Sequence, residues 1–290
     1  MSDKQRCLLA LHAHPDDESS KGAGTMARYA AEGIRVALVC ATGGEEGEIL
    51  NPRMDKPGIL ERIDEIRKAE LQTACDMLGV AEVYMLGYRD SGMPGRPSNK
   101  HPESFTAADP QEAVGRLVAI IRKERPEVVL SYDESRGYEH PDHVRVHEWG
   151  AQAFAAAGDP DRFPDRGEPW QPYKLYYFAT FSKQRMMALH QAMLDEGRES
   201  PYEGWLESWE ENGFRDPEIT TQLDVGDYVE LRTKALLAHA TQIDPDSWWF
   251  AIPDDVIRKV YPWEDYTLVT STVDTSSPES DLFEGIESAD

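Results

Sequence analysis

The sequence predicts an α/β protein with a mostly parallel sheet and helices on both faces. The main observation is that short apolar runs, rich in Val, Leu and Ala, alternate with longer segments of helical periodicity. Strands that are separated by helices form parallel sheets, because each helix carries the chain back across one face. At 290 residues with 40% hydrophobic content, the chain can also bury a core of the size that this fold needs.

The expected elements follow one another in this alternating order. Apolar runs predict strands over residues 7–12, 35–42, 82–86, 127–132 and 174–181. Helical patterns lie over residues 20–32, 60–78, 110–123 and 141–157, and the last begins with proline in its first turn. Two loops, 43–59 and 87–109, are longer than compact domains usually need, and such loops are often functional. The arrangement is Rossmann-like.

The pattern becomes less regular after Asp159. Helices are expected over residues 183–196 and 228–242, and tryptophans add apolar bulk to this part of the chain. We predict a single domain over residues 1–273, with a core over 1–182 and a C-terminal elaboration over 183–273. Residues 274–290 hold six acids and no base, which predicts a solvated, disordered tail.

The charge balance argues against several classes of partner. A formal net charge of −24 disfavours a nucleic acid or an anionic membrane surface, since both need clustered Lys and Arg. No run approaches the roughly 18 apolar residues of a membrane span, and the first residues lack a signal-peptide layout. We therefore expect a cytoplasmic protein. Cys7, Cys40 and Cys75 lie in apolar contexts and are expected to be reduced core thiols.

Metal-competent side chains follow the first predicted strand. His14, Asp16 and Asp17 come directly after the apolar run over residues 7–12. Functional sites of α/β sheets lie at this carboxyl edge of the strands. One carboxylate can bind a metal while its neighbour serves as a base. Taken alone, the same residues could form a strand-end turn with a helix N-cap.

A second polar segment, residues 136–143, follows the strand over residues 127–132. It contains His140 and His143, and His143 falls near the first turn of the helix over 141–157. By itself it could be a capped helix start. In a parallel sheet, however, it leaves from the same edge as His14, Asp16 and Asp17, so that the two segments converge. A catalytic zinc ion takes three protein ligands and keeps a fourth position open, and we predict such a site here.

Two further histidines could compete as ligands. His12 shares a strand face with His14, and His147 lies one helical turn beyond His143. We expect both to pack or to support the ligands, because three ligands are already available. The type of ligand does not separate zinc from ferrous iron, so Fe²⁺ stays an alternative.

These motifs resemble those of a known enzyme family. Residues 13–18, Ala-His-Pro-Asp-Asp-Glu, and residues 137–143, Gly-Tyr-Glu-His-Pro-Asp-His, are similar to the LmbE/PIG-L family of zinc-dependent N-deacetylases and amidases acting on amino sugars. The runs at 19–23, 42–45, 90–92, 169–172 and 239–250 resemble the amidases of this family. The resemblance extends over residues 7–267. It implies an LmbE-like fold and, as partner, a small amino-sugar thiol conjugate; the oligomeric state is left open.

The resemblance also implies roles for the two motifs. His14, Asp17 and His143 would bind Zn²⁺. Asp16 would act as the general base, and His140 as a general acid and oxyanion partner. This division suits amide hydrolysis, which needs a polarised carbonyl, an activated water and a protonated nitrogen.

Two other residues of the second motif are expected to assist catalysis. Asp142 is placed to hold His140 in its cationic form, because a carboxylate beside an imidazole raises the pKa of the ring. Alternatively, Asp142 is an ordinary acid in the first turn of a helix. The phenol of Tyr138 can reach an oxyanion, although a loop tyrosine often only packs.

Four residues are assigned to substrate binding. Similarity to the glucosaminyl-inositol deacetylases of the family implies that Glu48, Arg67 and Asp90 line the pocket for the hydroxyls of glucosamine and inositol. Arg67 could otherwise be a solvated charge three residues from Glu70. Lys21, within the run Ser-Ser-Lys-Gly, is the amidase-like form of the motif, and its alternative is a lysine that points to solvent.

The resemblance implies two functions, and the α/β pattern alone allows a third. The first is hydrolysis of the amide that joins N-acetylcysteine to glucosaminyl-inositol in S-conjugates of mycothiol, which releases a mercapturic acid during detoxification. The second is deacetylation of N-acetylglucosaminyl-inositol in mycothiol biosynthesis. The third, a non-catalytic domain that binds a sugar or nucleotide, is disfavoured because no glycine-rich phosphate fingerprint follows the first strand.

Overall fold

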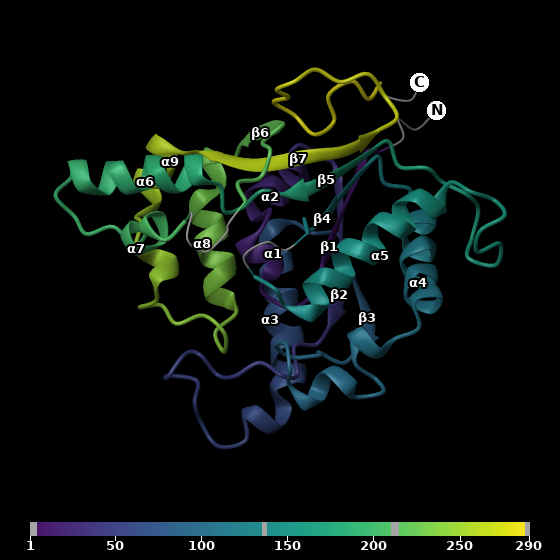
Figure 1. The fold of residues 1–290 in the computed structure, drawn as a ribbon, viewed down its shortest axis with the longest axis horizontal. Helices are drawn as coiled ribbons and strands as arrows, with labels where there is room; N and C mark the ends of the chain where they lie inside the picture. Colours follow the sequence, from purple (N-terminus) through teal and green to yellow (C-terminus); the bar gives the residue numbers. More distant parts are fainter. Residues whose placement is uncertain (1–4, 135–137, 210–214, 288–290) are drawn as a thin grey trace.

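The protein is seen in a computed structural model that describes residues 5–134, 138–209 and 215–287 (Figure 1). Its sheet has the strand order β3-β2-β1-β4-β5-β7-β6. The pairs from β3 to β5 are parallel, and β7 and β6 are added in the antiparallel direction. The predicted α/β fold with a mostly parallel sheet is confirmed. The strands are β1 (Cys7–His12), β2 (Arg35–Thr42), β3 (Glu82–Tyr88), β4 (Val128–Ser131), β5 (Lys174–Phe178), β6 (Thr221–Asp224) and β7 (Trp263–Ser271).

Helices cover both faces of the sheet. One layer contains α2, α3 and α8, and the other contains α4 and α5 (Figure 1). The α-helices are α1 (Asp17–Ser20), α2 (Ala23–Ala31), α3 (Ile63–Leu78), α4 (Pro110–Glu124), α5 (Pro141–Ala157), α6 (Lys183–Asp195), α7 (Glu203–Glu207), α8 (Val229–Ala238) and α9 (Asp254–Val260). Short 3₁₀ turns are η1 (Leu60–Arg62), η2 (Pro97–Lys100), η3 (Phe105–Ala107), η4 (Gly226–Tyr228) and η5 (Trp248–Phe250).

The first helical segment is broken in two, where the sequence predicted one helix over residues 20–32. α1 ends at Ser20 and α2 begins at Ala23, and Gly22 between them has a φ of 80°. A Cβ atom at this glycine would lie 2.7 Å from the ring of Phe178, so that both the space and the left-handed backbone require glycine. The break leaves α1 as a single turn at the carboxyl edge of the sheet.

The sheet continues into the C-terminal elaboration. β7 pairs with β5, and β6 pairs with β7 as the edge strand, so this part of the chain extends the same sheet. Neither strand was predicted. Charged residues such as Glu264 and Asp265 interrupt the apolar pattern of β7, and β6 is only four residues long.

The core lies between the sheet and its two helix layers. β1 is buried along its whole length, which explains its continuous apolar run. All three cysteines are buried, as expected of core thiols: Cys7, Cys40 and Cys75. Within the described part of the chain, no helix combines the length and the apolar character needed to cross a membrane.

The C-terminal stretch packs against this fold. The prediction of a solvated, disordered tail over residues 274–290 is contradicted by the burial of Glu279, Leu282, Phe283 and Ile286, whereas residues 274–278 are exposed; the last three residues lie outside the described part. The carboxylate of Glu279 lies 2.6 Å from the ammonium of Lys174, and both side chains are fully buried. The acidic stretch also contains three apolar side chains that act as anchors, because their burial stabilises the segment. These anchors are Leu282, Phe283 and Ile286.

Candidate active site

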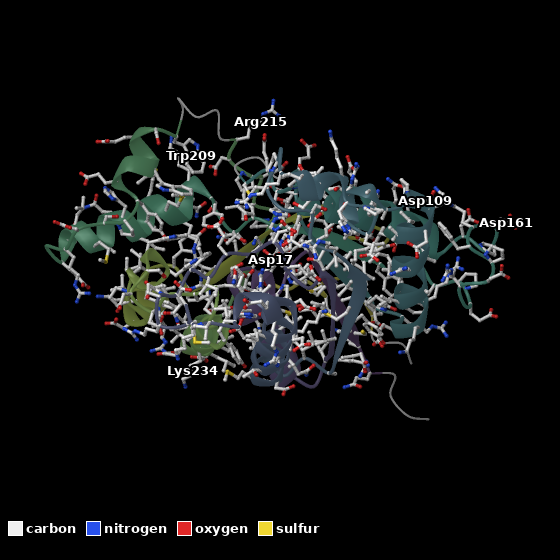
Figure 2. All side chains as sticks on the ribbon, turned by 90° about the horizontal axis from the view of Figure 1, so that it is seen from below. Asp17, Asp109, Asp161, Trp209, Arg215 and Lys234 are labelled. Carbon is white, nitrogen blue, oxygen red and sulfur yellow. The ribbon has the colours of Figure 1, made fainter. Side chains whose placement is uncertain are left out.

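The two polar segments meet at the carboxyl edge of the sheet. β1 and β4 are parallel neighbours, so the loops that follow them leave side by side. The first loop carries His14 and Asp16 and leads into α1 at Asp17, while His140 is the N-cap of α5 after the second loop. Asp17 lies near the middle of the molecule, among side chains from many elements (Figure 2). Residues 136 and 137 of the second motif lie outside the described residues.

His14, Asp17 and His143 form a buried group that fits a metal ion. Their ligand atoms all lie within 4.8 Å of one another. Oδ2 of Asp17 is 3.5 Å from Nδ1 of His14 and 3.3 Å from Nε2 of His143. That nitrogen of His143 is buried and has no hydrogen-bond partner among the described residues, as expected of an atom that can bind a metal ion.

Asp142 lies behind this group, on the other side of the His14 ring. Its Oδ2 atom is 3.2 Å from Nε2 of His14 and accepts the backbone N–H of Ser91 at 3.0 Å. A histidine that binds a metal through one ring nitrogen usually donates its other N–H to a carboxylate or carbonyl. The contact therefore favours Nδ1 of His14 as the nitrogen that faces the metal.

A second arrangement of ligands also exists in the structure. His14, Asp90, His140 and Asp142 offer ligand atoms within 4.8 Å of one another. This group would use Nε2 of His14, which lies 3.6 Å from Oδ1 of Asp90 and is already directed at Asp142. It would leave Nε2 of His143 without a partner, so the first group accounts for more of the buried polar atoms.

Asp16 lies beside the metal group in an unusual backbone conformation. Its φ of 113° is rare for a residue other than glycine, and such strain often marks a functional position. Its Oδ2 atom lies 3.0 Å from Nη2 of Arg67. Burial raises the pKa of Asp16, and this effect outweighs the lowering by Arg67. The carboxylate is thus a stronger base than an exposed aspartate.

Arg67 is held by several contacts within the protein. Its guanidinium donates to the carbonyl of Gly44 at 2.8 Å and to the carbonyl of Pro15 at 2.6 Å, in addition to its pairing with Asp16. Its side chain is buried. These contacts orient Asp16, and the substrate-binding role of Arg67 stays a prediction.

Two residues behind Asp16 were not singled out from the sequence. Glu18 and His239 form a buried ion pair, and Glu18 also accepts the backbone N–H of Asp16 at 2.9 Å. Glu18 belongs to the first motif and His239 opens the amidase-like run at 239–250. A charged residue inside each of these runs was the only signal available in the sequence.

His140 is neutral in this arrangement. Its Nδ1 atom accepts the backbone N–H of Asp142 at 3.2 Å, which leaves the ring proton on Nε2. Burial lowers the pKa of His140 to about 4, helped by the charge of His14, although Asp142 raises it. Asp142, whose Oδ2 lies 3.9 Å from Nδ1 of His140, raises this pKa as predicted, but burial and the charge of His14 outweigh it, so this arrangement does not support a cationic ring.

The remaining predicted residues divide into near and distant ones. The Lys21 ammonium lies 2.9 Å from Oδ1 of Asp17, so it does not point to solvent. The Tyr138 ring, which is half exposed, lies 5.1 Å from the ring of His143. Glu48, in contrast, is exposed and pairs with Arg96, so the structure does not bring its carboxylate into the buried group.

The two competing histidines contact the same tyrosine. Nδ1 of His12 lies 3.2 Å from the hydroxyl of Tyr132, and Nδ1 of His147 lies 2.9 Å from the carbonyl of that residue. Burial lowers the pKa of His12 to about 4. Neither belongs to the metal-competent groups of the described residues.

The comparisons of the sequence with known proteins define the class as enzymes that hydrolyse amide C–N bonds. The chain belongs to the PIG-L family, whose model, described as GlcNAc-PI de-N-acetylase, matches residues 9–154. A mycothiol S-conjugate amidase from Streptomyces coelicolor is 47% identical, covering 99% of each chain. A 1D-myo-inositol 2-acetamido-2-deoxy-alpha-D-glucopyranoside deacetylase from Thermobifida fusca is 40% identical and covers 98% of this chain and 100% of its own. The family resemblance of the two motifs is confirmed.

Solved structures support the fold alone. The N,N'-diacetylchitobiose deacetylase from Pyrococcus horikoshii superposes with a TM-score of 0.63 at 20% identity, covering 92% of this chain and 85% of its own. The 4-carboxy-2-hydroxymuconate hydratase GalB from Pseudomonas putida superposes with a TM-score of 0.62 at 17% identity, covering 94% of this chain and 99% of its own. The same fold thus occurs in proteins with names for different reactions, so function must be argued from the site.

Proposed function

We propose that this protein is a zinc-dependent amidase that acts on S-conjugates of mycothiol. Water would cleave the amide between N-acetylcysteine and glucosaminyl-inositol, giving a mercapturic acid and the free amino sugar, as in thiol-based detoxification. The observation that carries the proposal is the buried group of His14, Asp17 and His143 beside the strained carboxylate of Asp16. The 47% identity to an amidase supports the choice of substrate.

His14, Asp17 and His143 would hold the metal and leave the remaining positions open. When bound, a divalent zinc or iron ion supplies Lewis acidity toward the amide carbonyl and the attacking water. Asp142 would orient His14 through its hydrogen bond to Nε2. Lys21, whose ammonium contacts Oδ1 of Asp17, would keep that oxygen from rotating away.

Asp16 would move the proton in the reaction. Its raised pKa suits a base that takes the proton of the attacking water as the oxygen bonds to the carbonyl carbon. When the C–N bond breaks, the same proton can pass to the departing nitrogen, so that the reaction consumes one water and leaves the base unchanged. Arg67 holds the Asp16 carboxylate in one orientation during both transfers.

His140 would stabilise the negative charge that develops on the carbonyl oxygen. Because its Nδ1 accepts the amide hydrogen of Asp142, its Nε2–H is the donor that remains for the substrate. A neutral ring can donate this hydrogen bond at physiological pH without first gaining a proton. The phenol of Tyr138 lies beside the same imidazole, at 6.1 Å between ring centres, and could add a second donor.

The second candidate is deacetylation of N-acetylglucosaminyl-inositol. It is favoured by relatives that are named deacetylases and are about as long as this chain, such as the protein from Thermobifida fusca. Both reactions break an amide on the same amino sugar and differ only in the acyl half. Asp90, which lies 3.8 Å from His140, would serve either reaction.

A direct comparison of the two substrates tests the proposal. We expect the metal-loaded protein to show a higher kcat/KM for S-benzyl mycothiol than for N-acetylglucosaminyl-inositol. The reverse order would establish the deacetylase instead, and turnover of neither substrate would contradict both. Asp16→Asn, purified in parallel, controls for contaminating hydrolases, since it should lose activity toward whichever substrate is used.

A further inference from the structure

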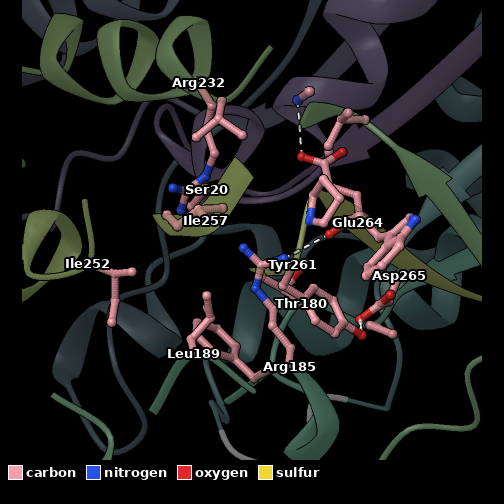
Figure 3. A pocket seen from close by; sticks show the side chains of 18 of the residues that line it. Ser20, Thr180, Arg185, Leu189, Arg232, Ile252, Ile257, Tyr261, Glu264 and Asp265 are labelled. Carbon is pink, nitrogen blue, oxygen red and sulfur yellow. Dashed lines mark hydrogen bonds between the residues drawn. The ribbon is translucent and has the colours of Figure 1, made fainter. Parts of the chain in front are cut away.

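A cavity opens beside the candidate active site, between the sheet and the C-terminal elaboration (Figure 3). Its volume is about 70 Å³, and Ser20 and Phe178 are among its lining residues. Ser20 accepts a hydrogen bond from Lys21 at 3.2 Å, and Lys21 in turn contacts Asp17 at 2.9 Å. One side chain therefore separates this cavity from the proposed metal ligand.

The cavity adjoins a second one lined by aromatic side chains, and the two together are called the hollow below. A second cavity of about 190 Å³ shares Phe181, Tyr202 and Trp248 with the first, so the two adjoin. Phe181, Trp205 and Trp248 are also partly exposed, at 38%, 45% and 47%. A dry cavity of about 150 Å³ suffices to hold benzene, so the second cavity alone has space for an aromatic ring.

Two arginines point into the first cavity from opposite sides. Arg232 reaches in from α8 and Arg185 from α6 (Figure 3). Burial and the charge of Arg185 lower the pKa of Arg232. Arg185 donates to the carbonyl of Trp263 at 2.8 Å, and Arg232 lies over the ring of Trp249 at 6.0 Å.

Neither guanidinium forms an ion pair with a carboxylate in the part of the chain that the structure describes. The two acids that line the cavity are occupied elsewhere. Glu264 accepts from the backbone N–H groups of Gly24 and Thr25, and Asp265 accepts from Tyr261 at 2.8 Å. In a chain with 54 acids and 30 bases, two cavity cations that form no ion pair among the described residues are not explained by a shortage of acids.

We propose that this hollow binds the S-linked group of the thiol conjugate and selects aromatic groups that carry a carboxylate. The sulfur is three bonds from the scissile carbonyl carbon, so its substituent must leave the metal group within a short distance. The aromatic side chains would pack on the ring, and Arg185 and Arg232 would pair with its anion. This inference rests on the proposed amidase function and adds the class of group that the enzyme prefers.

The test uses two conjugates of the same shape, S-benzyl mycothiol and S-(4-carboxybenzyl) mycothiol. The measured quantity is the ratio of kcat/KM for the carboxylated to the neutral conjugate, which does not depend on the fraction of active protein. We expect this ratio to exceed one for the wild type. Arg232→Met and Arg185→Met should each lower it about 10-fold, the loss expected for a charge-assisted hydrogen bond.

Two further variants sharpen the experiment. Lys234→Met removes a cation from the same helix at an exposed position, where Figure 2 shows the residue at the edge of the molecule, and should leave the ratio unchanged. Arg232→Glu should invert the preference toward S-(4-aminomethylbenzyl) mycothiol, a cationic conjugate. A ratio near one for the wild type, or a ratio that neither Arg232→Met nor Arg185→Met changes, would overturn the assignment of the cavity.

Failure of the proposed function gives a different result. If neither conjugate is cleaved while N-acetylglucosaminyl-inositol is deacetylated, both the amidase proposal and the cavity assignment are overturned. If both conjugates are cleaved without a preference for the carboxylate, only the assignment of the cavity is overturned.

Discussion

Nε2 of His239 lies 2.6 Å from Oε1 of Glu18, and both side chains are fully buried. The other oxygen of Glu18 accepts the backbone N–H of Asp16 at 2.9 Å. The pair therefore connects the end of α8 with the segment that carries the proposed base. Because Asp16 has a φ of 113°, its conformation needs support from its surroundings, and this pair supplies part of that support.

We expect His239→Ala to lower the free energy of unfolding by about 3–5 kcal/mol, the usual cost of leaving a buried charge without its partner. The same change should lower kcat more than it raises KM, because Asp16 loses its fixed orientation. Urea unfolding and steady-state kinetics measure the two effects. The exposed His101→Ala is the control, and equal stability of both variants would contradict the role of the pair.

The pH dependence of this contribution has a defined sign. Burial lowers the pKa of His239, but Glu18 outweighs it and raises this pKa above 6.5. Burial raises the pKa of Glu18, but His239 outweighs it and lowers this pKa below 4.5. The contribution of His239 to the free energy of unfolding is complete below pH 6.5 and is lost as the pH rises through its raised pKa. The contribution of Glu18 is complete above pH 4.5 and is lost as the pH falls through its lowered pKa.

The stability difference between wild type and His239→Ala should therefore be largest between pH 4.5 and 6.5. Unfolding curves recorded across this window and on both sides of it provide the check. A difference that increases toward alkaline pH would contradict the assigned charges.

The metal group predicts a joint loss of metal and activity. His14→Ala and His143→Ala each remove one of three ligands, so both variants should retain substoichiometric zinc or iron after dialysis. Metal analysis by mass spectrometry and activity assays on the same samples measure the effect. His147→Ala, whose ring contacts a backbone carbonyl outside the group, should keep its metal. A full complement of metal with near-normal activity in both ligand variants would exclude this site.

Asp16 and Asp17 should respond differently to the same substitution. Asp16→Asn keeps the side-chain volume and tolerates positive φ, so the metal should stay while kcat falls by roughly 10²-fold or more. Asp17→Asn should lose metal. If Asp16→Asn loses its metal and Asp17→Asn keeps it, the two roles have been exchanged.

Lys21 should influence the choice between the two amides. Its ammonium contacts Asp17 and Ser20, and Ser20 lines the cavity proposed for the S-linked group. Lys21→Ser should therefore lower cleavage of S-benzyl mycothiol more than deacetylation of N-acetylglucosaminyl-inositol. The exposed Lys68→Ser on α3 is the matched control. An unchanged ratio of the two rates would remove Lys21 from the selectivity of this site.

Removal of residues 274–290 should destabilise the protein. The stretch contributes three buried apolar side chains and the carboxylate that neutralises Lys174, so we expect a loss on the order of 5 kcal/mol. Thermal and urea unfolding of the truncated chain measure this loss. Glu279→Ala should reproduce part of it, whereas the exposed Glu287→Ala should not. Wild-type stability of the truncated chain would show that the packing of this segment contributes little.

The sequence by itself determined the fold class and the pairing of the two motifs. Strand and helix periodicity is local, and the carboxyl ends of neighbouring parallel strands must share an edge. His14 and His143 could therefore be expected together although they lie 129 positions apart in the sequence. The family resemblance added roles to these residues, because such motifs recur with their chemistry.

Only the tertiary structure decided which partner each charged group takes. Asp142 lies closer to His14 than to His140, Arg67 holds Asp16, and Glu18 meets His239 across 221 residues. These choices depend on how α1, α3 and α8 pack, and the packing energy is spread over many apolar contacts that no short motif encodes. The burial of Glu279 also depends on tertiary packing. The acidic composition of residues 274–290 predicted a disordered tail, because composition does not show which few side chains fit the surface of the fold.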